Sequence, residues 1–104
     1  MIKYRFTKEN GYIKTLTVKG HALFGEYGTD IVCSAVSTAL IVSVNAIEVL
    51  GYKENFYAKV EEGNFELTIY ETNEVIEGLL KNLEYTLNEL EAQYKTYIKN
   101  HKEG

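Results

Sequence analysis

Apolar and polar residues alternate along the first part of the chain. Residues 2–7 and residues 12–19 both follow a period of two, which is typical of β-strands with one buried and one solvated face. The Asn-Gly pair at residues 10–11 favours a hairpin turn between them. Lys14 interrupts the apolar face of the second strand, as a β-bulge would. The expected inward side chains of that strand are Tyr12, Leu16 and Val18.

The second half of the chain repeats this plan and ends in a helical pattern. Residues 55–60 and 64–70 alternate, and Glu62-Gly63 between them predicts a second turn. From Thr72 or Asn73 onward, apolar residues recur every three or four positions, which predicts a long amphipathic helix capped by one of these two residues. Its expected apolar stripe is Ile76, Leu79, Leu80, Leu83, Leu87, Leu90, Tyr94 and Ile98.

Between the two halves lies a loop followed by an apolar helix. Residues 20–30 show no periodicity and contain three glycines, which predicts a loop. Asp30 is a good N-cap, and the chain from residue 31 to about residue 50 is apolar nearly all round. Gly51 is then a plausible C-terminal stop. The order β-β-α-β-β-α predicts an α+β fold over residues 1–104, a two-layer domain with an antiparallel sheet covered by two helices.

Composition narrows the classes of function. The 104 residues carry a formal net charge of −4 and no basic run, which disfavours direct contact with nucleic acid and suits a basic protein or peptide partner. The single cysteine cannot form an internal disulfide, and we expect a cytoplasmic protein. We find no signal peptide and expect no membrane span. The spacing of the one cysteine and two histidines predicts no metal site, and we expect no cofactor.

The segment that suggests chemistry runs from His21 to Cys33. With Asp30 as the cap, Cys33 is the third residue of the helix, where free amides and the helix dipole favour a thiolate. A loop with glycines can fold His21 back towards it, and a nearby imidazolium would lower the thiol pKa further. A lone cysteine at the start of an apolar helix is, however, more often a small buried side chain.

A longer motif separates these two interpretations. The run GHALFGEYGTDIVCSAVS at residues 20–37 resembles the signature of the ribosomal-processing cysteine protease family, also called Prp or YsxB-like. SVNAI at residues 43–47 is similar to the family's helix continuation, and the chain length and element order also agree. Ser34, where the family commonly has alanine, is the one departure noticed.

The resemblance implies an activity, a substrate and an assembly. In the family, the cysteine and histidine of the motif are the catalytic pair, so Cys33 is the expected nucleophile and His21 the proton donor and acceptor. Such enzymes remove an N-terminal extension, or leader, from the large-subunit ribosomal protein L-twenty-seven. They form homodimers, so a second copy of the chain is an expected partner.

Several roles stay open at this point. Asp30 either orients His21 or only caps the helix, and Gly20, Gly25 and Gly28 serve as turn residues or as hinges of a loop that closes over substrate. Ser37, one turn beyond the cysteine, is expected to face the same cleft. The alternatives to a protease are a non-catalytic module that binds a ribosomal protein and a redox sensor that uses the thiol.

Overall fold

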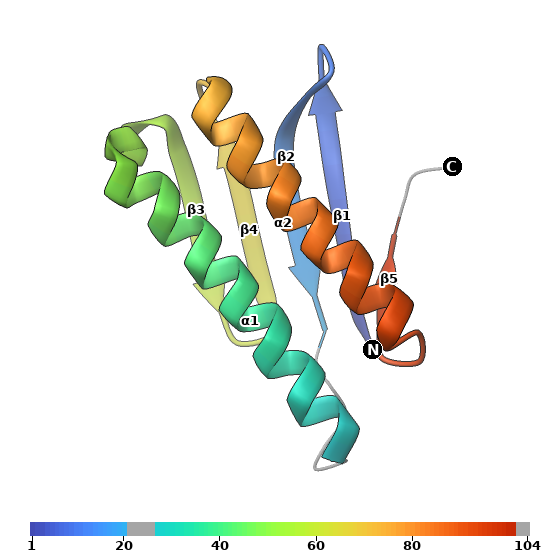
Figure 1. Cartoon of the computed structure of the whole chain (residues 1–104). Helices are drawn as coiled ribbons and strands as arrows, with labels where there is room; N and C mark the ends of the chain where they lie inside the picture. The colour runs from blue at the N-terminus through green and yellow to red at the C-terminus, as the bar shows by residue number, and fades with distance from the viewer. Residues whose placement is uncertain (21–26, 102–104) are drawn as a thin grey trace.

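The structure is a computed structural model that describes residues 1–20 and 27–101, with only the course of the backbone for residues 27–30. Two helices pack on one face of a five-stranded sheet (Figure 1). The elements are β1 (Ile2–Glu9), β2 (Tyr12–Lys19), α1 (Tyr27–Ile47), η1 (Glu48–Tyr52), η2 (Lys53–Asn55), β3 (Phe56–Glu61), β4 (Asn64–Ile69), α2 (Glu74–Gln93) and β5 (Ile98–Asn100). The predicted α+β class with two helices over a sheet is confirmed.

The sheet has the strand order β3-β4-β2-β1-β5. The first four strands form two antiparallel hairpins, and β2 pairs with β4 to join them. β5 runs parallel to β1, with Ile2 opposite Ile98. The sheet is therefore mixed, and the prediction of a wholly antiparallel sheet is wrong at this one edge.

The β1–β2 hairpin contains the predicted bulge. Thr7 is opposite Thr15 and Lys8 is opposite Ile13, so Lys14 has no partner across the pair. One extra residue reverses which side chains face the core on the turn side of the bulge. For this reason Ile13 is buried and Tyr12 is exposed, contrary to the expectation that Tyr12 points inward.

A buried carboxylate completes the hydrogen bonding at the bulge. Glu77 on α2 accepts a hydrogen bond from the backbone N–H of Ile13 at 3.2 Å and from the hydroxyl of Thr72 at 3.1 Å. A buried amide without a hydrogen-bond partner costs stability. Glu77 of α2 supplies the acceptor that the N–H of Ile13 lacks where the bulge interrupts the pairing of β1 and β2.

The second helix is shorter than the pattern predicts. Asn73 is the N-cap, as expected, and its side chain accepts a hydrogen bond from the backbone N–H of Ile76 at 2.9 Å. The helix ends at Gln93, and the chain turns so that Ile98 enters the core from β5. By sequence, Ile98 fits the helical spacing. In β5, however, its backbone groups form hydrogen bonds with β1, which they would lack at a frayed helix end.

A polar network fixes this C-terminal strand. The hydroxyl of Tyr4 donates to Asn88 at 2.6 Å and lies 3.3 Å from Glu91, while the other oxygen of Glu91 accepts from the backbone N–H of Asn100 at 2.6 Å. Burial and the negative charge of Glu91 raise the pKa of Tyr4 above its ordinary value. The neutral phenol is therefore the form that the fold favours.

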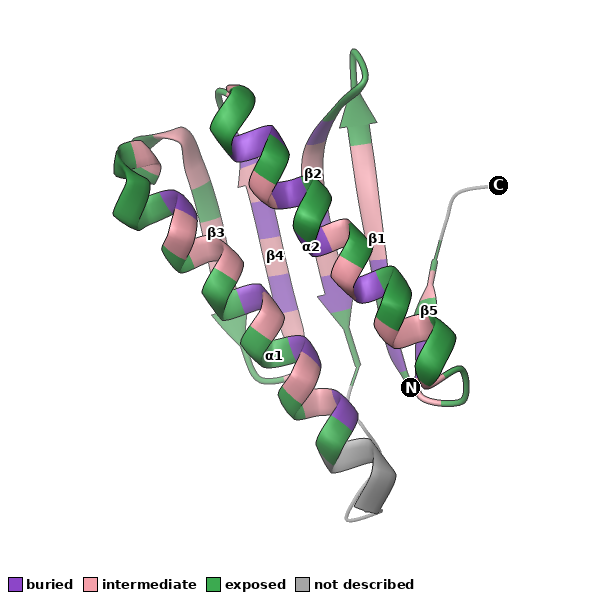
Figure 2. Cartoon of the chain, viewed as in Figure 1, coloured by how far each residue is buried: buried purple, intermediate pink, exposed green. Residues whose placement is uncertain are grey.

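Helix α1 is strongly apolar although much of it is exposed. By length and composition alone, Ile31–Asn55 would suffice to cross a membrane, contrary to the expectation from sequence, and 28% of the most apolar stretch is buried. The side chains that join the core are Val32, Val36, Leu40 and Ile47. Residues on its outer side are exposed (Figure 2). Gly51, at a φ of 100°, follows the end of α1 within η1, which agrees with its predicted role as a stop.

Candidate active site

Cys33 lies on α1 at the wall of a pocket. The pocket has a volume of about 280 Å³ and is bounded by α1, by the adjoining ends of β1 and β2, and by the β3–β4 turn. The thiol residue is half-buried and packs against the core. The apolar part of the lining is Ile2, Val18, Val36, Leu40, Ile41, Val60 and Phe65. An apolar side chain of a bound molecule could therefore occupy the pocket next to Cys33.

The helix that carries Cys33 begins earlier than predicted. It starts at Tyr27, so Asp30 is its fourth residue and Cys33 its seventh. The prediction that Asp30 caps the helix is therefore wrong, as is the placement of Cys33 in the first turn. In an α-helix the amide of a seventh residue bonds within the ladder and is not a free donor. The effect of the helix dipole is strongest in the first turn, and Cys33 lies beyond that turn.

Gly20 brings the start of the predicted loop to the same pocket. It lines the pocket together with Cys33, has a φ of 109°, and donates a backbone hydrogen bond to the carbonyl of Gly63 at 3.1 Å. A Cβ atom at this position would lie 2.2 Å from the backbone oxygen of Met1. Both the backbone angle and the close approach explain a glycine here.

Three predicted features fall partly or wholly outside the described residues. His21 and Gly25 lie there, and so does the side chain of Asp30. Gly28 was expected in the loop but is a residue of α1, so its predicted use as a loop turn or hinge is wrong. Gly20, which precedes His21 in the sequence, lines the same pocket as Cys33.

Other lining residues were either expected or missed by sequence reasoning. Ser37 lines the pocket, as its position one turn beyond Cys33 predicts, whereas Ser34 lies in a different groove towards α2. Glu61 and Glu62 also line the pocket and were not singled out as site residues. Their positions 28 and 29 residues beyond Cys33 give no local signal, and only the pairing of β4 with β2 brings their turn to this place.

The charge of the lining is negative. Among its described residues are two glutamates and no lysine or arginine. Glu61 lies 3.8 Å from the ammonium group of Lys59, which partly compensates its charge. Across residues 1–20 and 27–101, no group of three His, Cys, Asp or Glu side chains lies close enough to hold a metal ion.

Known proteins are similar to this chain in both sequence and fold. The family model "Cysteine protease Prp" matches residues 1–99. A ribosomal processing cysteine protease Prp from Staphylococcus aureus (strain Mu50) is 32% identical over 93 residues, which are 88% of each chain. The crystal structure of an essential ribosomal processing protease Prp from S. aureus in complex with a substrate peptide has a TM-score of 0.89 and 30% identity, covering 99% of this chain and all of that one.

A second solved structure bears on the chemistry of the family. It is the S. aureus protease with a covalently linked product peptide, at a TM-score of 0.86 and 29% identity, covering 99% of this chain and 100% of that chain. Covalent attachment of a peptide is what a nucleophilic mechanism leaves on an enzyme. The matching model spans nearly the whole chain, and the fold is shared over its full length. The chain therefore belongs to the family of the cysteine protease Prp and is a cysteine protease.

Proposed function

We propose that this protease removes the N-terminal leader of the ribosomal protein L-twenty-seven, with Cys33 as nucleophile and His21 as proton donor and acceptor. The observation that carries the proposal is the position of Cys33 at the wall of a pocket of about 280 Å³ with a largely apolar lining. The S. aureus relatives are ribosomal processing proteases, and one of them holds a substrate peptide, which supports a ribosomal protein as substrate. A cytoplasmic location is part of the same proposal.

The reaction proceeds by acyl transfer in two steps. The Cys33 thiolate attacks the carbonyl carbon of the scissile bond and forms a C–S bond, the C–N bond breaks, and His21 gives its proton to the departing amine. Water then attacks the thioester while His21 takes a proton from it, and the C–S bond breaks to release the leader as a free acid. Cys33 returns as thiolate and His21 as imidazolium.

The position of Gly20 supports this pairing. Gly20 lines the pocket with Cys33, and its hydrogen bond to Gly63 ties the strand end before His21 to the β3–β4 turn. Gly20, the residue before His21 in the sequence, therefore belongs to the pocket that Cys33 lines. The role of Asp30 in orienting His21 stays part of the proposal, because with the helix starting at Tyr27 its presence is no longer explained by capping.

The test is cleavage of a peptide that contains the leader and the first residues of mature L-twenty-seven. We expect the native chain to cut it, and Cys33→Ala and His21→Ala to lose activity by about 10³-fold or more, as when a member of a catalytic unit is removed. Ser34→Ala is the matched control, because Ser34 neighbours Cys33 but lies in a different groove. Binding of the peptide by native protein without cleavage would instead support the non-catalytic module.

We also propose that two copies pair through the outer side of α1. No Asp, Glu, Lys or Arg occurs between residues 31 and 47. Ile31 and Val42 of α1 are 44% and 60% exposed, and Val49 of the adjoining η1 is 83% exposed. Interfaces are depleted of charge at their centre, and an apolar side left in water favours a partner. A two-fold pairing of the same surface is the commonest form of assembly.

Light scattering after size-exclusion chromatography measures this directly. We expect a dimer for the native chain and a monomer for Val42→Glu, since the introduced carboxylate would be buried against its own copy. Tyr85→Glu, on an exposed position of α2, is the control and leaves the dimer intact. A native monomer at tens of micromolar would contradict the pairing.

A further inference from the structure

The face of the sheet that is turned away from the helices carries a row of lysines. In the part of the chain that the structure describes, α1 and α2 both lie on one face of the sheet (Figure 1). Successive residues of a strand point to opposite faces, so the residue after a buried one lies on the open face. Lys3, Lys19 and Lys99 each follow a buried residue of β1, β2 or β5 and are themselves exposed.

These three lysines, the lysine row, stand side by side. Lys3 is directly opposite Lys19 on one neighbouring strand and directly opposite Lys99 on the other. Adjacent strands are about 4.8 Å apart, so the row spans roughly 10 Å. Like charges directly opposite one another destabilise a sheet, and none of the three lysines forms an ion pair with a side chain that the structure describes. The described part of the chain therefore leaves this positive charge uncompensated.

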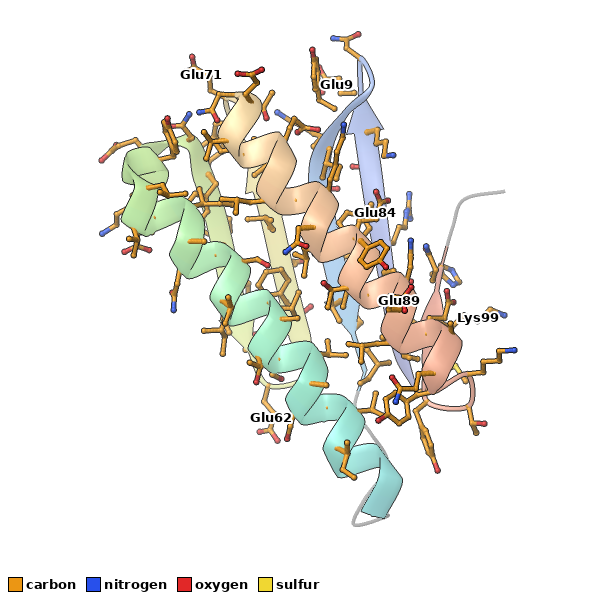
Figure 3. The ribbon with its side chains drawn as sticks, viewed as in Figure 1. Glu9, Glu62, Glu71, Glu84, Glu89 and Lys99 are labelled. Atoms are coloured by element: carbon orange, nitrogen blue, oxygen red, sulfur yellow. The ribbon has the colours of Figure 1, made fainter. Side chains whose placement is uncertain are left out.

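The rest of the open face adds hydroxyl groups and keeps its acidic residues away from the row. The same alternation places four threonines on it, namely Thr7, Thr15, Thr17 and Thr68. Glu61 and Glu66 lie on β3 and β4, where Lys59 is 3.8 Å from the first and directly opposite the second. Glu84 and Glu89 lie on α2, which covers the other face (Figure 3). The net charge of −4 sums over both faces and so conceals a positive area on the open one.

The chemistry of this area matches a nucleic-acid backbone. Ammonium and hydroxyl groups are typical contacts of phosphate and sugar, and such contacts do not depend on base sequence. Bound phosphates would also relieve the repulsion within the row. The row lies close to the pocket but on the opposite face of the sheet, because Ile2 and Gly20 line the pocket and are the sequence neighbours of Lys3 and Lys19. A partner bound at the row therefore leaves the pocket accessible.

We propose that the lysine row binds the phosphate backbone of RNA. RNA is favoured over an acidic protein because the proposed substrate is a ribosomal protein, and such proteins lie against RNA in the ribosome. A substrate already bound to RNA would bring phosphates to the open face while its leader enters the pocket. This choice of partner rests on the proposed function, whereas binding at the row does not require cleavage. The inference differs from the expectation based on net charge, which takes no account of how the charges are arranged.

Fluorescence anisotropy of a labelled, short RNA duplex mixed with the native chain measures this binding. We expect a dissociation constant on the order of 10–100 µM in 50 mM NaCl, because contacts to phosphates alone give weak affinity. Each phosphate contact contributes about 0.9 to the slope of log Kd against log[NaCl], so the slope should be about 2–3. The double substitution Lys3→Gln and Lys19→Gln should weaken binding by about tenfold and bring the slope below about 1.

The matched control is the double substitution Lys53→Gln and Lys81→Gln. Both lysines are exposed, and they lie on η2 and α2, so the control loses the same charge away from the row. It should bind RNA within about twofold of the native chain, since distant charges are screened by salt. Removal of Lys3 and Lys19 relieves repulsion between like charges, so urea unfolding should show no loss of stability.

Three results would decide against the inference. They are the absence of RNA binding by the native chain in 50 mM NaCl, an equal loss of binding in the two double variants, and tighter binding of a polyglutamate peptide than of RNA. The last result would assign the lysine row to an acidic protein. RNA binding that depends on Lys3 and Lys19, in a chain that does not cleave the leader peptide, would instead refute the protease proposal and keep the RNA site.

Discussion

Replacement of Gly20 by alanine tests how the fold holds the strand end before His21. A residue other than glycine at a φ of 109° carries backbone strain of about 1–2 kcal/mol. The new Cβ would also lie 2.2 Å from the backbone oxygen of Met1. That oxygen belongs to the same planar peptide group as the N–H of Ile2, which donates to Tyr97 at 2.8 Å. Met1 therefore cannot turn away without weakening a hydrogen bond.

The alternative is that Gly20 moves, which weakens its own hydrogen bond to Gly63. Loss of either bond costs about 0.5–1.5 kcal/mol, so Gly20→Ala should destabilise the fold by about 1.5–3.5 kcal/mol in total. Gly51 is the matched control, because its φ is 100° and an added Cβ meets nothing within 4 Å. Gly51→Ala should cost only the strain, about 1–2 kcal/mol.

Urea unfolding followed by circular dichroism gives both values under the same conditions. We also expect the melting temperature of Gly20→Ala to fall by roughly 6 °C or more, since about 1 kcal/mol corresponds to 4–8 °C in a domain near this size. If Gly20→Ala were no less stable than Gly51→Ala, the contact with Met1 would carry no energy and the reasoning would be refuted.

Three further substitutions test the polar contacts of the fold. The raised pKa of Tyr4 means that the folded state keeps the phenolic proton more tightly than the unfolded chain. Stability from this group is complete below about pH 10 and is lost as pH rises above it, so Tyr4→Phe should flatten the alkaline fall in an unfolding titration. Glu77→Ala should cost about 1–3 kcal/mol in urea unfolding, because it leaves the buried amide of Ile13 without its acceptor. Asn73→Ala should cost about 0.5–2 kcal/mol by the same measurement through loss of the cap on Ile76, and a cost below 0.3 kcal/mol would argue against that cap.

Local patterns in the sequence were enough to predict most of the fold. Alternation, the two turns with glycine and the cap at Asn73 each depend on neighbouring residues, and they occur as expected except that Tyr12 points outward. Even the bulge at Lys14 was visible, because a charged residue on an apolar face breaks the period of two.

Features that depend on distant partners were not predictable in this way. Ile98 continues the helical spacing, and only its pairing with Ile2 makes it part of a strand. The start of α1 at Tyr27 also escaped prediction, because Asp30 has the chemistry of a cap and Gly28 that of a loop. Once a long helix is packed on a sheet, extending it by a turn costs little, so local preference is overridden.

The candidate site also contains residues that local sequence predicts and residues that it does not. Cys33 and Ser37 were identified from the motif and helical spacing, and both line one pocket. Glu61 and Glu62 reach that pocket only through the order of strands in the sheet, which no single stretch of sequence encodes. The full lining of the pocket is thus harder to find from sequence than the cysteine beside it.

The most direct test of the mechanism is the mass of the protein during turnover. Native chain mixed with excess leader peptide and quenched in acid should gain the mass of the leader less one water, and peptide mapping should assign this thioester to Cys33. The adduct should be absent from Cys33→Ala. Cleavage of the peptide with no adduct at Cys33 in single-turnover conditions, or with undiminished activity in Cys33→Ala, would contradict nucleophilic attack by this thiol.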